Sequence, residues 1–209
     1  MSSGGHIAEF VELVFPLGSG SLRMDYPLPL WQALRDALPW LAEDDEIAIL
    51  PIKGGGFSEG RMILGQRARL TLRMPRSRIE EAQELAGQGL KFGLDPGDEL
   101  RLGEPHVRAL QPTSTQYSPM VVFGHDDEAV FLAECSRALE AMGVGGNLVC
   151  GKAQARLGEA GELRGFSLML HGLSAGHALR LQQHGLGNAR KIGCGIFVSH
   201  KTAAAVGAG

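Results

Sequence analysis

The residues with the clearest potential for chemistry lie in a glycine-rich segment near the C-terminus, residues 185–197. It combines two adjacent cations with four glycines, namely Arg190, Lys191, Gly185, Gly187, Gly193 and Gly195. Glycine lets backbone N–H groups approach an anion, and the cations add charge and donors. The segment therefore predicts a phosphate-binding surface, with a flexible loop and two solvated cations as the alternative. It matches neither the phosphate loop of nucleotide hydrolases nor the glycine motif of dinucleotide-binding folds.

Candidate acid–base groups precede this segment. His177 and His184 begin and end the predicted helix before it, on roughly the same face. Imidazole exchanges protons near neutral pH, which suits proton transfer to a phosphate on the segment, and His177 is the preferred candidate. Lys53 ends a predicted strand at the glycine-rich residues 54–56 and could neutralise a phosphate. For each of these side chains a structural or solvated role is the alternative.

Composition indicates a globular protein with local basic regions. Of its 209 residues, 44% are hydrophobic and 21% are charged, and its 30 glycines exceed the usual share of about 7%. A net charge of -3 and a pI of about 6.2 are unlike those of a typical nucleic-acid-binding protein. Cations nevertheless gather in residues 67–78 and 180–201. A local basic groove of this kind could still hold RNA.

Cysteine usage and hydropathy bear on location. Cys135, Cys150 and Cys194 have no metal-like spacing, and their odd number without a signal peptide favours reduced thiols in the cytoplasm. No apolar run approaches the roughly 18 residues that a membrane span needs. We therefore expect a cytoplasmic protein with no metal, no cofactor and no membrane contact.

Hydrophobic patterning predicts the same order of elements twice. In the first half we expect one helix that begins at Pro27 and a second that follows an N-cap at Ser77. We expect strands there at residues 8–15, 47–52, 69–74, 90–92 and 99–102. The second half is expected to contain helices at 128–142 and 175–184, and strands at 120–123, 147–150, 153–157, 166–170 and 196–198. Strand, helix, strand, strand, helix, strand is the ferredoxin-like order. We predict an α+β protein with two tandem ferredoxin-like domains, residues 1–104 and 105–209.

Short stretches along the whole chain resemble one group of proteins. They are residues 13–17, 25–26, 69–75, 85–87 and 185–197. Together they resemble the RAMP superfamily, the repeat-associated RNA-binding proteins of CRISPR systems. Within it, the chain is similar to the short myxobacterial-type branch of the repeat-cleaving endoribonucleases. The resemblance implies two ferredoxin-like domains that hold RNA across their junction and on the glycine-rich segment.

The resemblance also implies a cut that needs no metal ion. The ribose 2′-OH attacks the adjacent phosphate and leaves a 2′,3′-cyclic phosphate and a 5′-OH end. Such a reaction needs a base, an acid and a cation for the charge that develops on the phosphate. The implied partners are CRISPR repeat RNA, as precursor and as mature guide RNA, and other CRISPR effector subunits.

One position departs from the family pattern. The branch usually carries a histidine before the first helix, in a context such as Asp-His-Gly, where this chain has Asp25, Tyr26 and Pro27. A phenol, whose ordinary pKa is about 10, can still serve as an acid or an orienting donor. The candidate catalytic residues are therefore Tyr26, His177 and Lys53. The departure also motivates a second hypothesis, a repeat-RNA-binding subunit that does not cut.

Four further cations are candidates for RNA contact. Arg69 and Arg73 alternate with apolar residues on one predicted strand and would give it a charged outward face. Lys152 and Arg156 follow Gly151, where relatives tend to carry a basic cluster. A solvated face is the alternative for all four. A third hypothesis, from another class, is a ferredoxin-like small-molecule or protein-interaction domain, which would suit the acidic pI.

Overall fold

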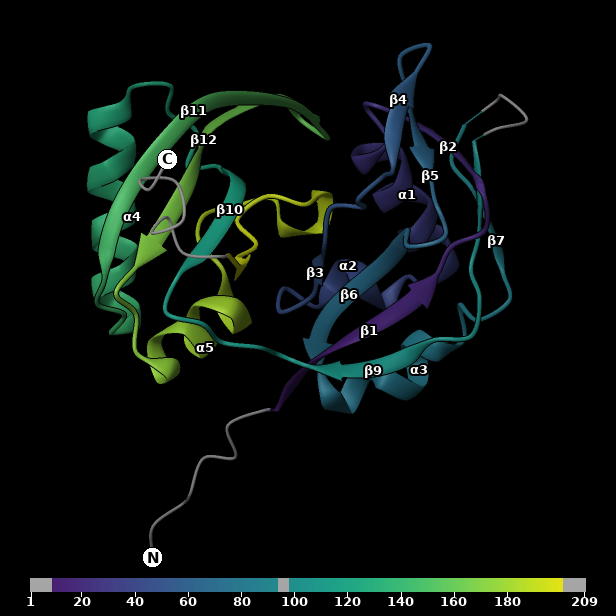
Figure 1. Ribbon diagram of the computed structural model, residues 1–209, viewed down its shortest axis with the longest axis horizontal. Coiled ribbons are helices and arrows are strands. Elements are labelled where there is room, and N and C mark those ends of the chain that lie inside the picture. Colours follow the sequence, from purple (N-terminus) through teal and green to yellow (C-terminus); the bar gives the residue numbers. More distant parts are fainter. Residues whose placement is uncertain (1–8, 94–97, 201–209) are drawn as a thin grey trace, which may run out of the picture. The chain divides into compact units, whose positions relative to one another are not determined.

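The computed structural model describes residues 9–93 and 98–200. The chain divides into two compact units, Met1–Leu110 and Gln111–Gly209 (Figure 1). Each unit contains its own four-stranded antiparallel sheet, and the strands of both sheets follow the order expected for a ferredoxin-like fold. The predicted α+β class and ferredoxin-like fold are therefore confirmed.

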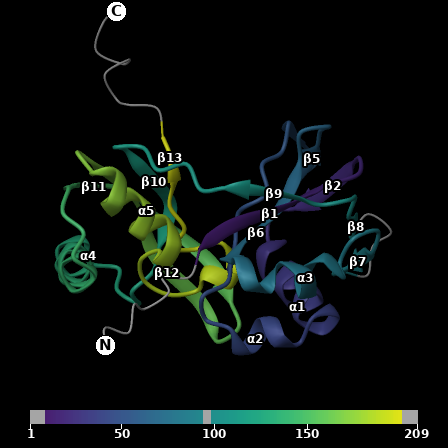
Figure 2. The same ribbon diagram turned by 90° about the horizontal axis from the view of Figure 1, so that it is seen from below.

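The sheet of the first unit has the strand order β3 (Ala48–Ile49), β6 (Arg69–Pro75), β1 (Phe10–Pro16), β9 (His106–Ala109). β1 and β6 pair in register from Phe10 opposite Pro75 to Pro16 opposite Arg69. Three helices lie on one side of this sheet (Figure 2): α1 (Pro27–Ala37), α2 (Trp40–Glu43) and α3 (Ile79–Gln83). Because β9 pairs with β1, the first unit continues to Leu110, beyond residue 104.

Two small sheets complete the first unit. One has the strand order β2 (Gly20–Arg23), β5 (Arg61–Leu64), β4 (Gly56–Ser58), and the other is the hairpin of β7 (Gly89–Lys91) and β8 (Glu99–Arg101). The three-stranded sheet is absent from the sequence-based prediction, because its short strands show little alternation and β2 pairs with a strand distant in the sequence. The expected cap at Ser77 is wrong: Ser77 lies inside a 3₁₀ turn, η1 (Arg76–Arg78), and α3 has no side-chain cap.

The sheet of the second unit has the strand order β11 (Asn147–Gly158), β12 (Gly161–His171), β10 (Gln116–Val121), β13 (Val198–Ser199). Two separate strands were expected where β11 runs continuously, with a shift in register between Cys150 and Ala153. The helices are α4 (Glu128–Met142) and α5 (Ala175–His184), and a 3₁₀ turn, η2 (Arg190–Ile192), follows α5. The side chains of Asp127 and Ser174 cap the two helices by accepting from backbone N–H groups.

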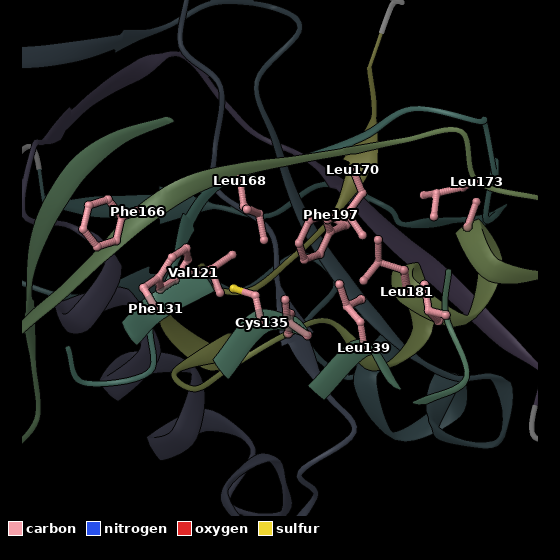
Figure 3. Close-up of a cluster of buried hydrophobic side chains, with 13 residues drawn as sticks. Val121, Phe131, Cys135, Leu139, Phe166, Leu168, Leu170, Leu173, Leu181 and Phe197 are labelled. Carbon is pink, nitrogen blue, oxygen red and sulfur yellow. The ribbon is translucent and has the colours of Figure 1, made fainter. Parts of the chain in front are cut away.

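The core of the second unit lies between its sheet and both helices (Figure 3). Phe131 on α4 packs against Phe166 on β12, with ring centroids 4.8 Å apart. Leu181 on α5 and Leu168 on β12 are fully buried in the same cluster. This packing fixes α5, and with it the start of the glycine-rich segment, against the sheet. Within the described residues, no helix is both long and apolar enough to span a membrane.

Candidate functional site

The glycine-rich segment is bound to the second unit through its backbone. The Leu186 N–H donates to the Gly195 carbonyl at 3.0 Å, which closes the segment on itself. The Gly195 N–H donates to the Met120 carbonyl at 2.7 Å, and the Asn188 N–H donates to the Val122 carbonyl at 2.8 Å. The segment is therefore held along β10 by backbone hydrogen bonds, and the alternative of a flexible loop is wrong.

Close backbone packing explains the glycines of this segment. Gly185, Gly187 and Gly195 have φ of +67°, +73° and +66°, in the region that side chains disfavour. A Cβ at any of the three would lie well inside 3.0 Å of a neighbouring backbone oxygen. These glycines are needed to let the chain pass against itself and against β10. Their role as phosphate ligands stays a prediction.

Two of the predicted RNA-binding arginines hold this segment in place. Arg190 donates from Nη2 to the Gln183 carbonyl at 2.7 Å, at the end of α5. Arg156, which lies on β11, donates to the Ile192 carbonyl at the end of η2. Between these two anchors, Lys191 lies half-buried within η2. Lys152 lies exposed on β11.

His177 lies at the far end of α5 from the glycine-rich segment. It stands in the first turn, and seven residues at about 1.5 Å each separate it from His184 along the helix axis. Its ring Nδ1 accepts from the Gly145 N–H at 3.2 Å, so the imidazole contacts the turn before β11. The exposed His184, the last residue of α5, is the histidine that adjoins the segment.

In the first unit, the Tyr26 hydroxyl is bonded to the backbone of the residue before Lys53. Tyr26 precedes α1, and its hydroxyl oxygen accepts from the Ile52 N–H at 2.8 Å. Ile52 is followed directly by Lys53, whose side chain is exposed. This bond joins the start of α1 to the chain that enters the glycine-rich residues 54–56. Tyr26 is therefore bonded to the residue that precedes Lys53, whereas His177 belongs to the other unit.

An ion pair next to Tyr26 sets the local charge. Arg23 donates to both carboxylate oxygens of Asp25, at 3.0 and 2.6 Å. The side-chain hydrogen bond from Arg23 lowers the pKa of Asp25, against a smaller opposing effect of burial. Asp25 therefore stays ionised and paired at neutral pH.

The expected charged outward face of β6 is wrong for Arg73. Arg73 is 1% exposed and donates to Glu12, which lies directly opposite it on β1. The buried position is possible because Glu12 supplies the opposite charge. Arg69, at the strand end, donates to the Gln66 and Ala68 carbonyls. A glutamate within the apolar run of residues 10–15 was the signal that a buried cation should face it.

Comparison with known proteins identifies relatives over nearly the whole chain. Residues 11–202 match the family model described as Cas6, Cas6 Crispr. The chain is 36% identical over 203 residues to the CRISPR-associated endonuclease Cas6 of Myxococcus xanthus (strain DK1622), covering 97% of this chain and 86% of that protein.

Solved structures share the fold at low sequence identity. The product of a Cas6-related gene from Pyrococcus furiosus superposes with a TM-score of 0.63 at 16% identity, covering 93% of this chain and 99% of that one. A CRISPR-associated protein Cas6 superposes with a TM-score of 0.61 at 10% identity, covering 92% of this chain and 99% of that one. An RAMP protein binding different RNA substrates superposes with a TM-score of 0.58 at 14% identity, covering 90% of this chain and 98% of that one.

Proposed function

Because this chain belongs to the Cas6 family, we propose that it is a CRISPR RNA maturation endoribonuclease. It binds precursor repeat RNA and cleaves it by attack of a ribose 2′-OH, without a metal ion. The products carry a 2′,3′-cyclic phosphate and a 5′-OH. The observation that carries this proposal is the 36% identity, over 97% of the chain, to a CRISPR-associated endonuclease. An RAMP protein of the same fold that binds RNA substrates agrees with the RNA part of it.

Tyr26 and Lys53 are the proposed centre of the reaction. The hydrogen bond between the Tyr26 hydroxyl and the Ile52 N–H supports this choice, because it fixes the phenol to the backbone one residue before Lys53. Lys53 would neutralise the charge that develops on the phosphate, and Tyr26 would donate a proton to, or orient, a reacting oxygen. His177 remains a candidate acid or base whose ring must then release Gly145.

Variants at these positions test the assignment. General acid–base groups contribute about 10²–10⁴-fold to rate, so Tyr26→Phe should slow single-turnover cleavage by at least about 100-fold and leave RNA affinity unchanged. Lys53→Ala should slow cleavage as well, and Lys53→Arg should restore part of it. Wild-type rates for Tyr26→Phe would remove the phenol from the mechanism. Wild-type rates for His177→Ala would do the same for the imidazole.

The remaining phosphate contacts are proposed to come from the glycine-rich segment and from Lys191, with Lys152, Arg156, Arg190 and Arg69 as further candidates. Replacing Arg190 and Lys191 together should weaken binding to RNA of any sequence, because phosphate contacts carry no sequence information. Unchanged affinity would remove the segment from the RNA site. Retention of the mature guide RNA and assembly with other CRISPR effector subunits are part of the same proposal.

The alternative is an RNA-binding subunit that does not cut, which the tyrosine at position 26 favours. Incubation with the host's own repeat RNA distinguishes the two. Fragments that end in a cyclic phosphate would establish the nuclease. Tight binding of intact RNA, with no fragments under single-turnover conditions, would establish the binding subunit.

A further inference from the structure

Three charged residues form a row across the sheet of the first unit. Glu12 on β1 lies opposite Arg73 on β6 and, on its other side, opposite Arg108 on β9. Residues directly opposite each other in an antiparallel sheet point to the same face, so the three side chains share one face. We call this row the Arg–Glu–Arg triad.

Each of the two arginines binds one oxygen of the Glu12 carboxylate. Arg73 donates to Oε1 from Nη2 at 2.8 Å and from Nε at 3.3 Å. Arg108 donates to Oε2 from Nη2 at 2.6 Å and from Nε at 2.9 Å. Both oxygens of Glu12 are thus bound, and the Arg108 guanidinium is fixed in a two-bond geometry.

The triad carries an excess of positive charge. One carboxylate faces two guanidiniums, which leaves a net charge of one within the triad. Burial is the main cause that lowers the pKa of Arg73, Glu12 raises this pKa, and the nearby Arg108 lowers it. The second arginine therefore adds a repulsion to Arg73, while its own bonds to Glu12 join β9 to β1.

Arg108 is the accessible member of the triad. Its side chain is 49% exposed, whereas the side chains of Glu12 and Arg73 are 8% and 2% exposed. In the parts of the chain that the structure describes, Nε and Nη2 of Arg108 are used for Glu12 and Nη1 makes no hydrogen bond. A guanidinium held this way presents donors in a fixed direction, which suits an oxyanion.

We propose that Arg108 is a binding position for a backbone phosphate of the RNA. The phosphate would supply the negative charge that the triad lacks. Glu12 and Arg73 are positioning residues, since they orient Arg108 and need not touch RNA. This inference rests on the proposed function, because RNA is the anion that it names.

Arg164 in the second unit provides a matched control. Its side chain is 59% exposed, and it binds two carboxylates, Glu162 at 2.6 Å and Asp126 at 3.2 Å. Its local charge balance is therefore opposite to that of the triad, with one guanidinium facing two carboxylates. Replacing Arg164 removes one exposed guanidinium, as replacing Arg108 does, but from a cluster whose net charge is negative.

The experiment measures affinity for repeat RNA as a function of salt concentration. Each lost phosphate contact should reduce the slope of log K against log salt by about 0.7 for single-stranded and 0.9 for duplex nucleic acid. Arg108→Gln should therefore flatten the slope by about this amount and raise the Kd roughly tenfold or more at low salt. Arg108→Lys keeps the charge and should keep the slope. Arg164→Gln should leave both quantities unchanged.

Each outcome decides the inference. If the wild-type protein binds repeat RNA and Arg108→Gln binds it with the same slope and affinity, the inference is overturned and the proposed function stands. A flattened slope with Arg164→Gln as well would show a general charge effect and also overturn it. Failure of the wild-type protein to bind repeat RNA would overturn the proposed function and the inference together.

Discussion

Replacement of Gly195 by alanine should destabilise the second unit by several kcal/mol. Two separate costs add at this position. Its φ of +66° costs an L-residue about 1–2 kcal/mol, and the new Cβ would overlap the Leu186 carbonyl oxygen, an overpacking cost of about 1–3 kcal/mol. The sum is about 2–5 kcal/mol, and it arises because residues 186 and 195 pack backbone against backbone.

Two other glycines of the same unit separate these costs. Gly124 has φ of +88° with no described atom near the position that a Cβ would take, so Gly124→Ala should show the backbone cost alone, about 1–2 kcal/mol. Gly176 lies in α5 with neither a positive φ nor a described atom near its Cβ position. Gly176→Ala should therefore stabilise the helix by about 0.5–1 kcal/mol.

The assay must report on the second unit. The two tryptophans, Trp31 and Trp40, both lie in the first unit, so their fluorescence in urea serves as an internal control. Amide hydrogen exchange of peptides from β10 and β12 measures the opening free energy of the second unit. If Gly195→Ala lowers the opening free energy of the second unit by no more than Gly124→Ala does, the close approach to Leu186 is refuted as the reason for this glycine.

Three further predictions concern buried groups and caps. Arg61→Met should cost about 3–5 kcal/mol in urea unfolding, because it leaves the Asp98 carboxylate, 2% exposed, without the guanidinium bound at 2.8 Å. Asp127→Ala should cost about 1 kcal/mol and increase hydrogen exchange in the first turn of α4, because it removes the cap. Burial, and to a smaller extent the charge of nearby Cys150, raises the pKa of the Cys135 thiol to about 12. A folded pKa above the unfolded value means that stability falls as pH rises from about 9 toward 12, with a shallower fall in Cys135→Ala.

The sequence predicted the fold class because its long elements carry strong local patterns, although the strand expected at 99–102 lies in the β7–β8 hairpin and β9 completes the sheet in its place. The helix at 128–142 and the helix at 175–184 were predicted with the observed bounds, since apolar spacing and caps agree there. The sheet of β2, β4 and β5 was missed because its strands are too short to show alternation and are defined by their partners. Such pairing is a property of the folded chain and has no local signal.

The candidate site was harder to predict because a charge pattern does not reveal its partner. Arg73 has the spacing of an exposed strand residue, yet Glu12, distant in sequence, pairs with it and allows it to be buried. Arg190 is predicted from the glycine-rich segment and Arg156 from the family resemblance, and their bonds to backbone carbonyls depend on the path of that segment. Tyr26 and Lys53 are predicted separately, and the bond from Ile52 that fixes the Tyr26 hydroxyl depends on tertiary structure.

The most direct test of the proposed function is cleavage of the host's repeat RNA by the purified protein in excess EDTA. A matched RNA with a single 2′-deoxyribose at the cut site serves as the control, because it lacks the nucleophile. The proposal predicts cleavage that persists in EDTA and is abolished by the deoxy substitution. Loss of cleavage in EDTA, or cleavage of the deoxy substrate at the same position, would contradict a metal-independent attack by the 2′-OH.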